Sequence, residues 1–120
     1  MIGETLLLIA LLCKKRIYVA GPMTNIPDYN YPAFRDMHKR LTAGGFVDIL
    51  DPTTIAEGDT SKPYNFYIRE SLKLLAKAEA MIMLDGWEKS KGACLEYQAA
   101  RAMNLTILDQ NFNIITDFTK

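Results

Sequence analysis

Glu96 is the residue of this sequence best placed to do chemistry. It shares one face of a predicted helix over residues 92–104 with four uncharged residues: Gly92, Ala99, Ala100 and Met103. A carboxylate on such a face is expected to be partly buried against a sheet, which costs free energy unless another group pairs with it. A glutamate that edges out to solvent near the helix start is the structural alternative. The functional interpretation is a nucleophile or base aimed at a ligand, kept ionised by the helix amino terminus against the effect of burial.

The loop before this helix has the composition of an anion site. Residues 86–92 (GWEKSKG) contain two glycines, a serine hydroxyl and the free N–H groups of a helix start, which together can seat a phosphate. Simple capping of the helix by Ser90 explains the serine equally well. Lys89 and Lys91 either add charge to a phosphate contact or only solvate the loop.

A second loop leaves the first predicted strand at Gly21 and Pro22. Gly21 lets a ligand approach the backbone closely, although plain turn chemistry accounts for the Gly-Pro pair as well. The presence of two such loops, each directly after a strand, favours the functional interpretation over either loop taken alone.

The elements that position these residues alternate between short apolar runs and amphipathic stretches, which is typical of βαβ units. Strands are predicted over residues 16–20, 46–50, 80–84 and 105–108, and helices over residues 32–43, 65–77 and 92–104. The fold class is therefore α/β: a single Rossmann-like, doubly wound parallel sheet of about four to five strands in the order 2-1-3-4. This sheet reverses between its first and third strands, so a ligand is expected where the two loops meet. The long connection over residues 51–63 is typical of a functional lid.

The composition describes one ordinary globular domain of 120 residues, with 49% hydrophobic and 23% charged residues. Fourteen basic and fourteen acidic residues cancel, so polymeric nucleic acid is not an expected partner. Cys13 and Cys94 stand far apart and have no histidine near them, which indicates no metal or dithiol site and a reducing, cytoplasmic compartment. The single histidine, His38, is expected on the surface of a helix.

Residues 1–14 are predicted to be an apolar amino-terminal extension before a domain over residues 15–120. The apolar run at residues 6–13 is shorter than the about 20 residues that span a membrane. Glu4 precedes it and three basic residues follow it, the reverse of a secretory signal, so no membrane contact is expected. We expect the run to pack on the domain or on a second subunit, or to reflect an early start codon.

Two motifs together carry a resemblance to a known family. The segment YVAGP at residues 18–22, followed after the third predicted strand by S-x-G-x-x-x-E at residues 90–96, resembles the nucleoside 2-deoxyribosyltransferase-like superfamily. Within it, residues 84–93 (LDGWEKSKGA) resemble a branch found in phage and prophage genomes. The similarity extends over about residues 16–108.

The resemblance implies hydrolysis of the N-glycosidic bond of a (deoxy)nucleoside 5′-monophosphate, as in 2′-deoxynucleoside 5′-phosphate N-hydrolases. Glu96 takes the part of the nucleophile that attacks C1′, and Asp85 that of a carboxylate that holds the sugar or protonates the leaving base. No metal or organic cofactor is required. The positions implied to bind substrate are Tyr18, Gly21, Pro22, Ser71, Gly86, Ser90 and Gly92, with Ser90 on the 5′-phosphate.

Two positions depart from the family pattern. Ser71 stands where relatives usually have an aspartate, and Gln98 stands where proven transferases often have a glycine. Three alternatives therefore stay open: a protein that binds or sequesters nucleotides without catalysis, a 2-deoxyribosyltransferase, and a structural or assembly protein. Relatives commonly form homodimers or larger homo-oligomers, and the same is expected here.

Overall fold

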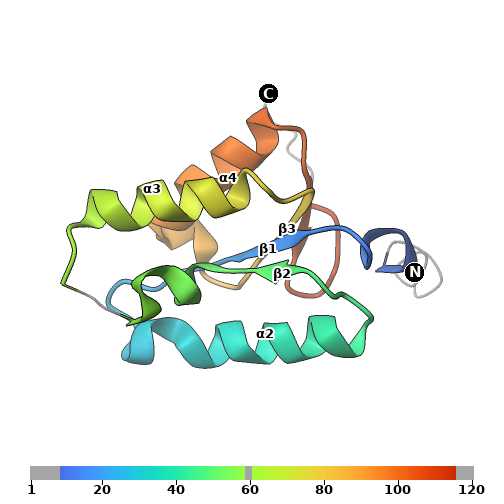
Figure 1. Ribbon diagram of the computed structural model, residues 1–120, viewed down its shortest axis with the longest axis horizontal. Coiled ribbons are helices and arrows are strands. Elements are labelled where there is room, and N and C mark those ends of the chain that lie inside the picture. The colour runs from blue at the N-terminus through green and yellow to red at the C-terminus, as the bar shows by residue number, and fades with distance from the viewer. Residues whose placement is uncertain (1–8, 59–60, 116–120) are drawn as a thin grey trace.

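A four-stranded sheet forms the centre of the molecule in a computed structural model that describes residues 9–58 and 61–115 (Figure 1). Its strands are β1 (Ile17–Ala20), β2 (Ile49–Leu50), β3 (Ala80–Met83) and β4 (Thr106–Asp109). All neighbouring strands pair in parallel, in the order β2-β1-β3-β4. The predicted α/β fold and strand order are therefore confirmed.

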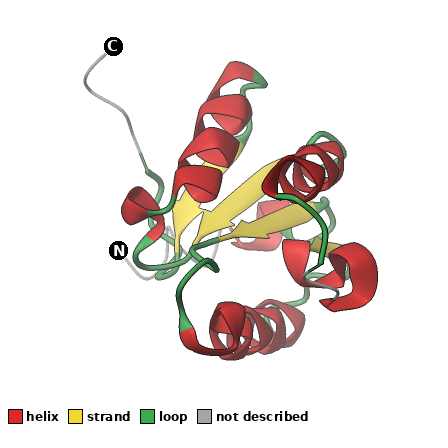
Figure 2. Cartoon of the chain, turned by 90° about the vertical axis from the view of Figure 1, so that its left-hand side faces the viewer, coloured by secondary structure: helices red, strands yellow, loops and turns green. Residues whose placement is uncertain are grey.

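Helices cover both faces of the sheet (Figures 1 and 2). The three long ones are α2 (Tyr31–Ala43), α3 (Tyr64–Leu75) and α4 (Lys91–Ala102), with α2 on one face and α3 and α4 on the other. Three shorter 3-10 segments lie in the connections: η1 (Pro27–Asn30), η2 (Pro52–Gly58) and η3 (Trp87–Lys89). These segments directly follow β1, β2 and β3, so η1, η2 and η3 lie at the carboxyl ends of the parallel strands.

Alternate side chains of the central strands build two separate hydrophobic cores. Ile17 and Val19 of β1 pack with α2, whereas Tyr18 and Ala20 of the same strand pack with α3 and α4. Every residue of β1 and β3 is buried, as a parallel strand covered on both faces must be. The polar phenol of Tyr18 thus lies inside the molecule, on the side of α4.

The amino-terminal run packs on the α2 side of the sheet as far as the structure describes it. Residues 9–12 are helical, and Leu12 is buried in the same cluster as Phe46. Residues 1–8 of the predicted extension lie outside the described residues. Within residues 9–58 and 61–115, no helix has the length and apolar character needed to cross a membrane.

The second strand is shorter than the sequence predicts. It begins at Ile49 rather than at residue 46, because the backbone N–H of Phe46 donates to the carbonyl of Leu41 at 3.0 Å and so helps to end α2. Phe46 then turns its ring into the core, where it is 3% exposed. Residues 46–48 therefore form a connection between α2 and β2, and the carbonyl of Asp48 already accepts from the backbone N–H of Ile17 in β1 at 3.0 Å.

Candidate functional site

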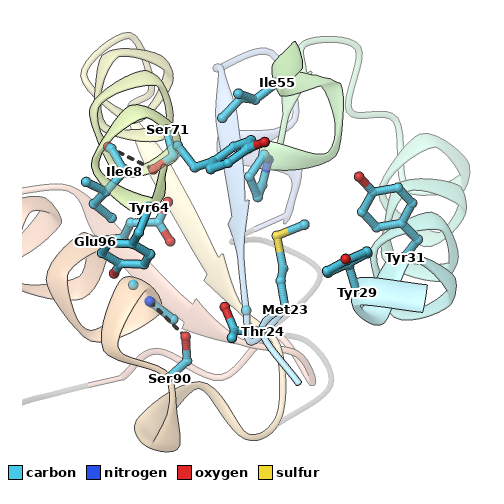
Figure 3. A pocket seen from close by; sticks show the side chains of 15 residues that line it. Met23, Thr24, Tyr29, Tyr31, Ile55, Tyr64, Ile68, Ser71, Ser90 and Glu96 are labelled. Carbon is cyan, nitrogen blue, oxygen red and sulfur yellow. Dashed lines mark hydrogen bonds between the residues drawn. The ribbon is translucent and has the colours of Figure 1, made fainter. Parts of the chain in front are cut away.

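A cavity of about 250 Å³ opens at the carboxyl ends of β1 and β2, bordered by α3 and α4 (Figure 3). It is lined by Gly21, Met23, Thr24, Tyr29, Tyr31, Pro52, Ile55, Tyr64, Tyr67, Ile68, Ser71, Ser90, Gly92, Ala93 and Glu96. In Figure 3, Tyr29 and Tyr31 lie on one side of this space, and Tyr64 and Glu96 lie on the other. Pro52 and Ile55 come from η2, so the long connection predicted as a lid borders the cavity.

Glu96 is buried in the wall of this cavity, with 4% of its surface exposed. One of its carboxylate oxygens accepts a hydrogen bond from the phenol of Tyr18, which reaches it from the central strand. Burial raises the pKa of Glu96 from 4.5 to about 7, while hydrogen bonds with Tyr18 and Ser71 oppose that rise. Burial therefore works against the ionised form, which the sequence led us to expect the helix amino terminus to favour.

Tyr18 and Ser71 complete the polar group around Glu96. Burial, and then the negative charge of Glu96, raise the pKa of Tyr18 well above its usual value, so its phenol keeps the proton that it donates. Ser71 is 5% exposed on α3, and its hydroxyl donates to the carbonyl of Ile68 at 3.1 Å. The structure thus brings together three of the predicted site residues: Ser71 and Glu96 line the cavity, and Tyr18 lies directly behind Glu96.

The amino end of α4 forms another part of the wall. Ser90 caps this helix, and its hydroxyl oxygen accepts from the backbone N–H of Ala93 at 3.1 Å. Capping uses a lone pair and leaves the hydroxyl proton for a second partner, so capping and ligand binding are compatible in one side chain. Gly92 lies two residues further on. A Cβ added at Gly92 would lie 3.4 Å from the hydroxyl of Tyr64, so a side chain there would narrow the cavity at this end.

Three predicted residues lie instead in an adjoining depression of about 660 Å³: Pro22, Asp85 and Gly86. Asp85 is exposed, and its backbone N–H donates to the side chain of Gln110 at 2.8 Å. The structure does not bring its carboxylate into the cavity of Glu96. The two hollows meet, since four residues line both: Thr24, Tyr64, Ser90 and Gly92.

At two positions of these loops the structure requires a glycine. Gly21 passes so close to β3 that a Cβ there lies 2.8 Å from Cβ of Leu84, nearer than real side chains approach. Gly86 has a φ of +88°, a left-handed conformation that favours glycine. Both glycines shape the loops that the ligand is expected to meet.

Sequence reasoning missed the aromatic character of the cavity. Four of the six tyrosines line it, namely Tyr29, Tyr31, Tyr64 and Tyr67. They occur as two close pairs in the sequence, one at residues 29 and 31 before and at the start of α2, the other at residues 64 and 67 in the first turn of α3. The pairing was visible in the sequence, but the meeting of the two pairs at one cavity was not.

Tyr29 lies in a strained stretch of backbone at the rim. Asp28, Tyr29 and Asn30 have φ values of 54°, 52° and 62°, three consecutive left-handed residues without a glycine. Such strain persists where the surrounding structure imposes it, commonly at binding sites. The strained turn holds Tyr29 beside Tyr31, with ring centroids 6.3 Å apart.

Comparisons with known proteins support the fold. No curated protein matches the chain. Among solved structures, a 2-desoxiribosyltransferase from Leishmania mexicana is similar, with a TM-score of 0.60 and 24% identity over 79% of this chain. The match spans 63% of that enzyme, less than two thirds of its length. The match shows that this chain shares its fold with that enzyme.

The family model described as "Domain of unknown function (DUF4406)" matches residues 15–109. This range contains all four strands of the sheet and every residue that lines the cavity. The chain belongs to the DUF4406 family.

Proposed function

We propose that the protein cleaves the N-glycosidic bond of a (deoxy)nucleoside 5′-monophosphate, with Glu96 as the nucleophile. The observation that carries this proposal is the buried carboxylate of Glu96, which lines a tyrosine-walled cavity and is held by Tyr18. The fold shared with a 2-desoxiribosyltransferase supports it, because that enzyme's name denotes transfer of a deoxyribosyl group.

The proposed reaction has two displacements at C1′. The ionised carboxylate of Glu96 attacks C1′, and the glycosidic bond breaks with its electron pair going to the base, which takes up a proton. Water then attacks C1′ of the glycosyl ester, releasing the sugar phosphate and the glutamate, so that the configuration is retained. A second base in place of water gives the transferase variant of the same chemistry. Asp85 lines the adjoining depression, so no proton transfer to the base is assigned to it.

The site offers a place for each part of such a substrate. Ser90 and Glu96 are six residues apart on α4, about 9 Å along its axis, a span for the sugar and its 5′-phosphate to bridge. The hydroxyl proton of Ser90 and the first N–H groups of α4 are donors for that phosphate. The facing tyrosines supply aromatic surfaces for the base.

The test is detection of free base by chromatography. The protein is incubated with ribo- and deoxyribonucleoside 5′-monophosphates and with the unphosphorylated nucleosides, alongside Glu96→Ala. We expect base release from the monophosphates and none in the variant, while ligand binding by the variant stays measurable as a rise in melting temperature. Glu88→Ala, an exposed glutamate of η3, is the matched control and keeps full activity.

Two results would contradict this proposal. Turnover retained by Glu96→Ala removes this residue from the mechanism. Equal release from phosphorylated and unphosphorylated nucleosides removes the assigned contact between Ser90 and the phosphate.

The second function that the site supports is nucleotide binding without catalysis. Two observations favour it: a serine hydroxyl stands at position 71, where relatives usually have a carboxylate, and Asp85 lies outside the cavity of Glu96. Its signature is a ligand-induced rise in melting temperature with no base released from any member of the panel.

A further inference from the structure

The depression beside the Glu96 cavity has more room than a single phosphate group requires. Its volume is about 660 Å³, against about 250 Å³ for the cavity itself. We propose that this depression binds the phosphates beyond the first of a nucleoside 5′-di- or triphosphate. The inference rests on the proposed function, because it takes the nucleoside to occupy the Glu96 cavity.

The position of the depression fits a ligand that extends from the cavity. It lies between the loop that follows β1, which supplies Thr24 and Asn25, and the loop that follows β3, which supplies Lys89 and Ser90. Between β1 and β3 the strand order reverses, and ligands of doubly wound sheets bind beyond the strand ends at such a point. Since Ser90 and Gly92 line both hollows, a phosphate chain that passes Ser90 continues directly into the depression.

The charge of the depression suits an anion. Lys89 and Lys91 both line it, and Asp85 is the one carboxylate among the lining residues. The ammonium nitrogen of Lys91 lies 5.7 Å from the ring centre of Tyr64, which stands at the boundary between the two hollows. None of the ion pairs among the described residues includes Lys89 or Lys91, so both ammonium groups are available to phosphate oxygens.

The opposite wall supplies neutral donors. The side chains of Asn25 and Asn30 line the depression from the β1 loop and from the start of α2. Each amide carries two N–H donors. Lysines on one wall and amides on the other match a chain of phosphate oxygens better than a neutral or apolar 5′ substituent.

The experiment is a titration series along the phosphate chain. The nucleoside is one whose base the base-release panel shows to be released; if none is released, each of the common deoxynucleosides is used. Its 5′-mono-, di- and triphosphates are titrated into the protein and binding is measured by calorimetry. EDTA is present, so that Mg²⁺ does not neutralise the phosphates. Glu96→Gln replaces the wild-type protein for any nucleotide that the wild type cleaves. We expect each phosphate beyond the first to tighten binding by about 3- to 10-fold, with a smaller gain at high salt.

Paired lysine variants locate the effect. Lys89→Ala/Lys91→Ala should weaken triphosphate binding several-fold more than monophosphate binding. Lys73→Ala/Lys77→Ala is the control, because it removes the same charge from two exposed positions in and just after the last turn of α3, away from the depression. In this control variant, each added phosphate should still tighten binding as in the wild type.

Three outcomes overturn the inference: a triphosphate that binds no more tightly than the monophosphate, an equal loss in the control pair, and failure of every nucleotide to bind. Base release without a gain along the phosphate series rejects the inference and leaves the proposed function standing. A gain that depends on Lys89 and Lys91, with no base release, supports the inference and rejects the proposed cleavage.

Discussion

The phenol of Tyr18 and the carboxylate of Glu96 share a hydrogen bond that joins the central strand to α4 across 78 positions of sequence. Both side chains are buried, at 0% and 4% exposure. A strand paired on both sides and a 12-residue helix are rigid supports, so the orientation of the carboxylate is set by the fold rather than by a loop. The carboxylate of the proposed site is therefore held by a strand inside the sheet.

Removal of this hydrogen bond should change the ionisation of Glu96. In Tyr18→Phe the carboxylate loses a donor that lowers its pKa, so we expect that pKa to rise above about 7. The ionised form is the nucleophile of the proposed reaction, so the acid limb of the pH profile for base release should move to higher pH. At pH 7 we expect turnover to fall by roughly tenfold or more, given the usual worth of a hydrogen bond to a charged group.

The same change can be measured without turnover. NMR titration of the side-chain carboxyl carbon of Glu96 reports its pKa directly in both proteins. Tyr97→Phe is the control, since that ring packs on Trp87 with centroids 4.7 Å apart and does not line the cavity. A carboxyl titration that is the same in Tyr18→Phe and in the wild type contradicts the prediction.

Burial of Glu96 should also make stability depend on pH. Its pKa is about 7 in the folded state against 4.5 as the reference, so between these values the folded state binds more protons than the unfolded state. The free energy of unfolding therefore falls as pH rises from 4.5 to 7, by about 3 kcal/mol from this residue. Glu96→Gln lacks this dependence.

Urea unfolding of the two proteins at several pH values checks this expectation. Glu96→Gln should be more stable than the wild type at pH 8, and the difference should shrink towards pH 4.5. A difference that is constant over this range, or larger in acid, is the result that speaks against it.

Ser90 should contribute separately to the stability of the fold and to nucleotide affinity. Ser90→Ala removes the cap that Ala93 uses, so we expect a loss of about 1 kcal/mol in the free energy of unfolding. Ser90→Asp keeps a capping oxygen and the stability but places a negative charge beside the proposed phosphate, so monophosphates should bind at least tenfold more weakly. Chemical unfolding and calorimetry on both variants separate the effects. Unchanged nucleotide affinity in Ser90→Asp would place the phosphate elsewhere.

Gly21 should tolerate no side chain. In Gly21→Ala the new Cβ lies 2.8 Å from Cβ of Leu84, which is 2% exposed, so the strands must shift. Overpacking of this kind costs about 1–3 kcal/mol. Gly44→Ala, at an exposed helix end where the nearest atom is 3.5 Å away, should change stability by under about 0.5 kcal/mol. Equal thermal melts for both variants count against a packing role for Gly21.

The fold was predictable because its signals are local and agree with one another. The apolar runs at β1 and β3 and the periodic stripes of α2, α3 and α4 are each readable within a short window. The handedness of parallel crossovers then leaves few strand orders. The start of β2 was placed three residues too early, because the bond from Phe46 to Leu41 belongs to the end of a helix and an apolar pattern cannot reveal it.

The candidate site was predictable only in part. Spacing along one helix placed Glu96, Ser90 and Gly92 together, and the structure has all three in one cavity. Spacing could not show that Asp85 lines the adjoining depression, nor that burial raises the pKa of Glu96, because both depend on side chains from distant elements. The tyrosine walls were missed for the same reason, since rings from η1, α2 and α3 meet only after folding.

In the left-handed turn at the rim, the residue that suits the proposed binding site is not the residue that best stabilises the fold. Asp28 and Asn30 are residue types whose short polar side chains tolerate positive φ angles, whereas a tyrosine has no such compensation and costs roughly 1–2 kcal/mol there. A glycine at this position would relax the chain and strip one aromatic ring from the cavity. Selection of variants for heat resistance alone would therefore favour loss of a ring that lines the proposed binding site.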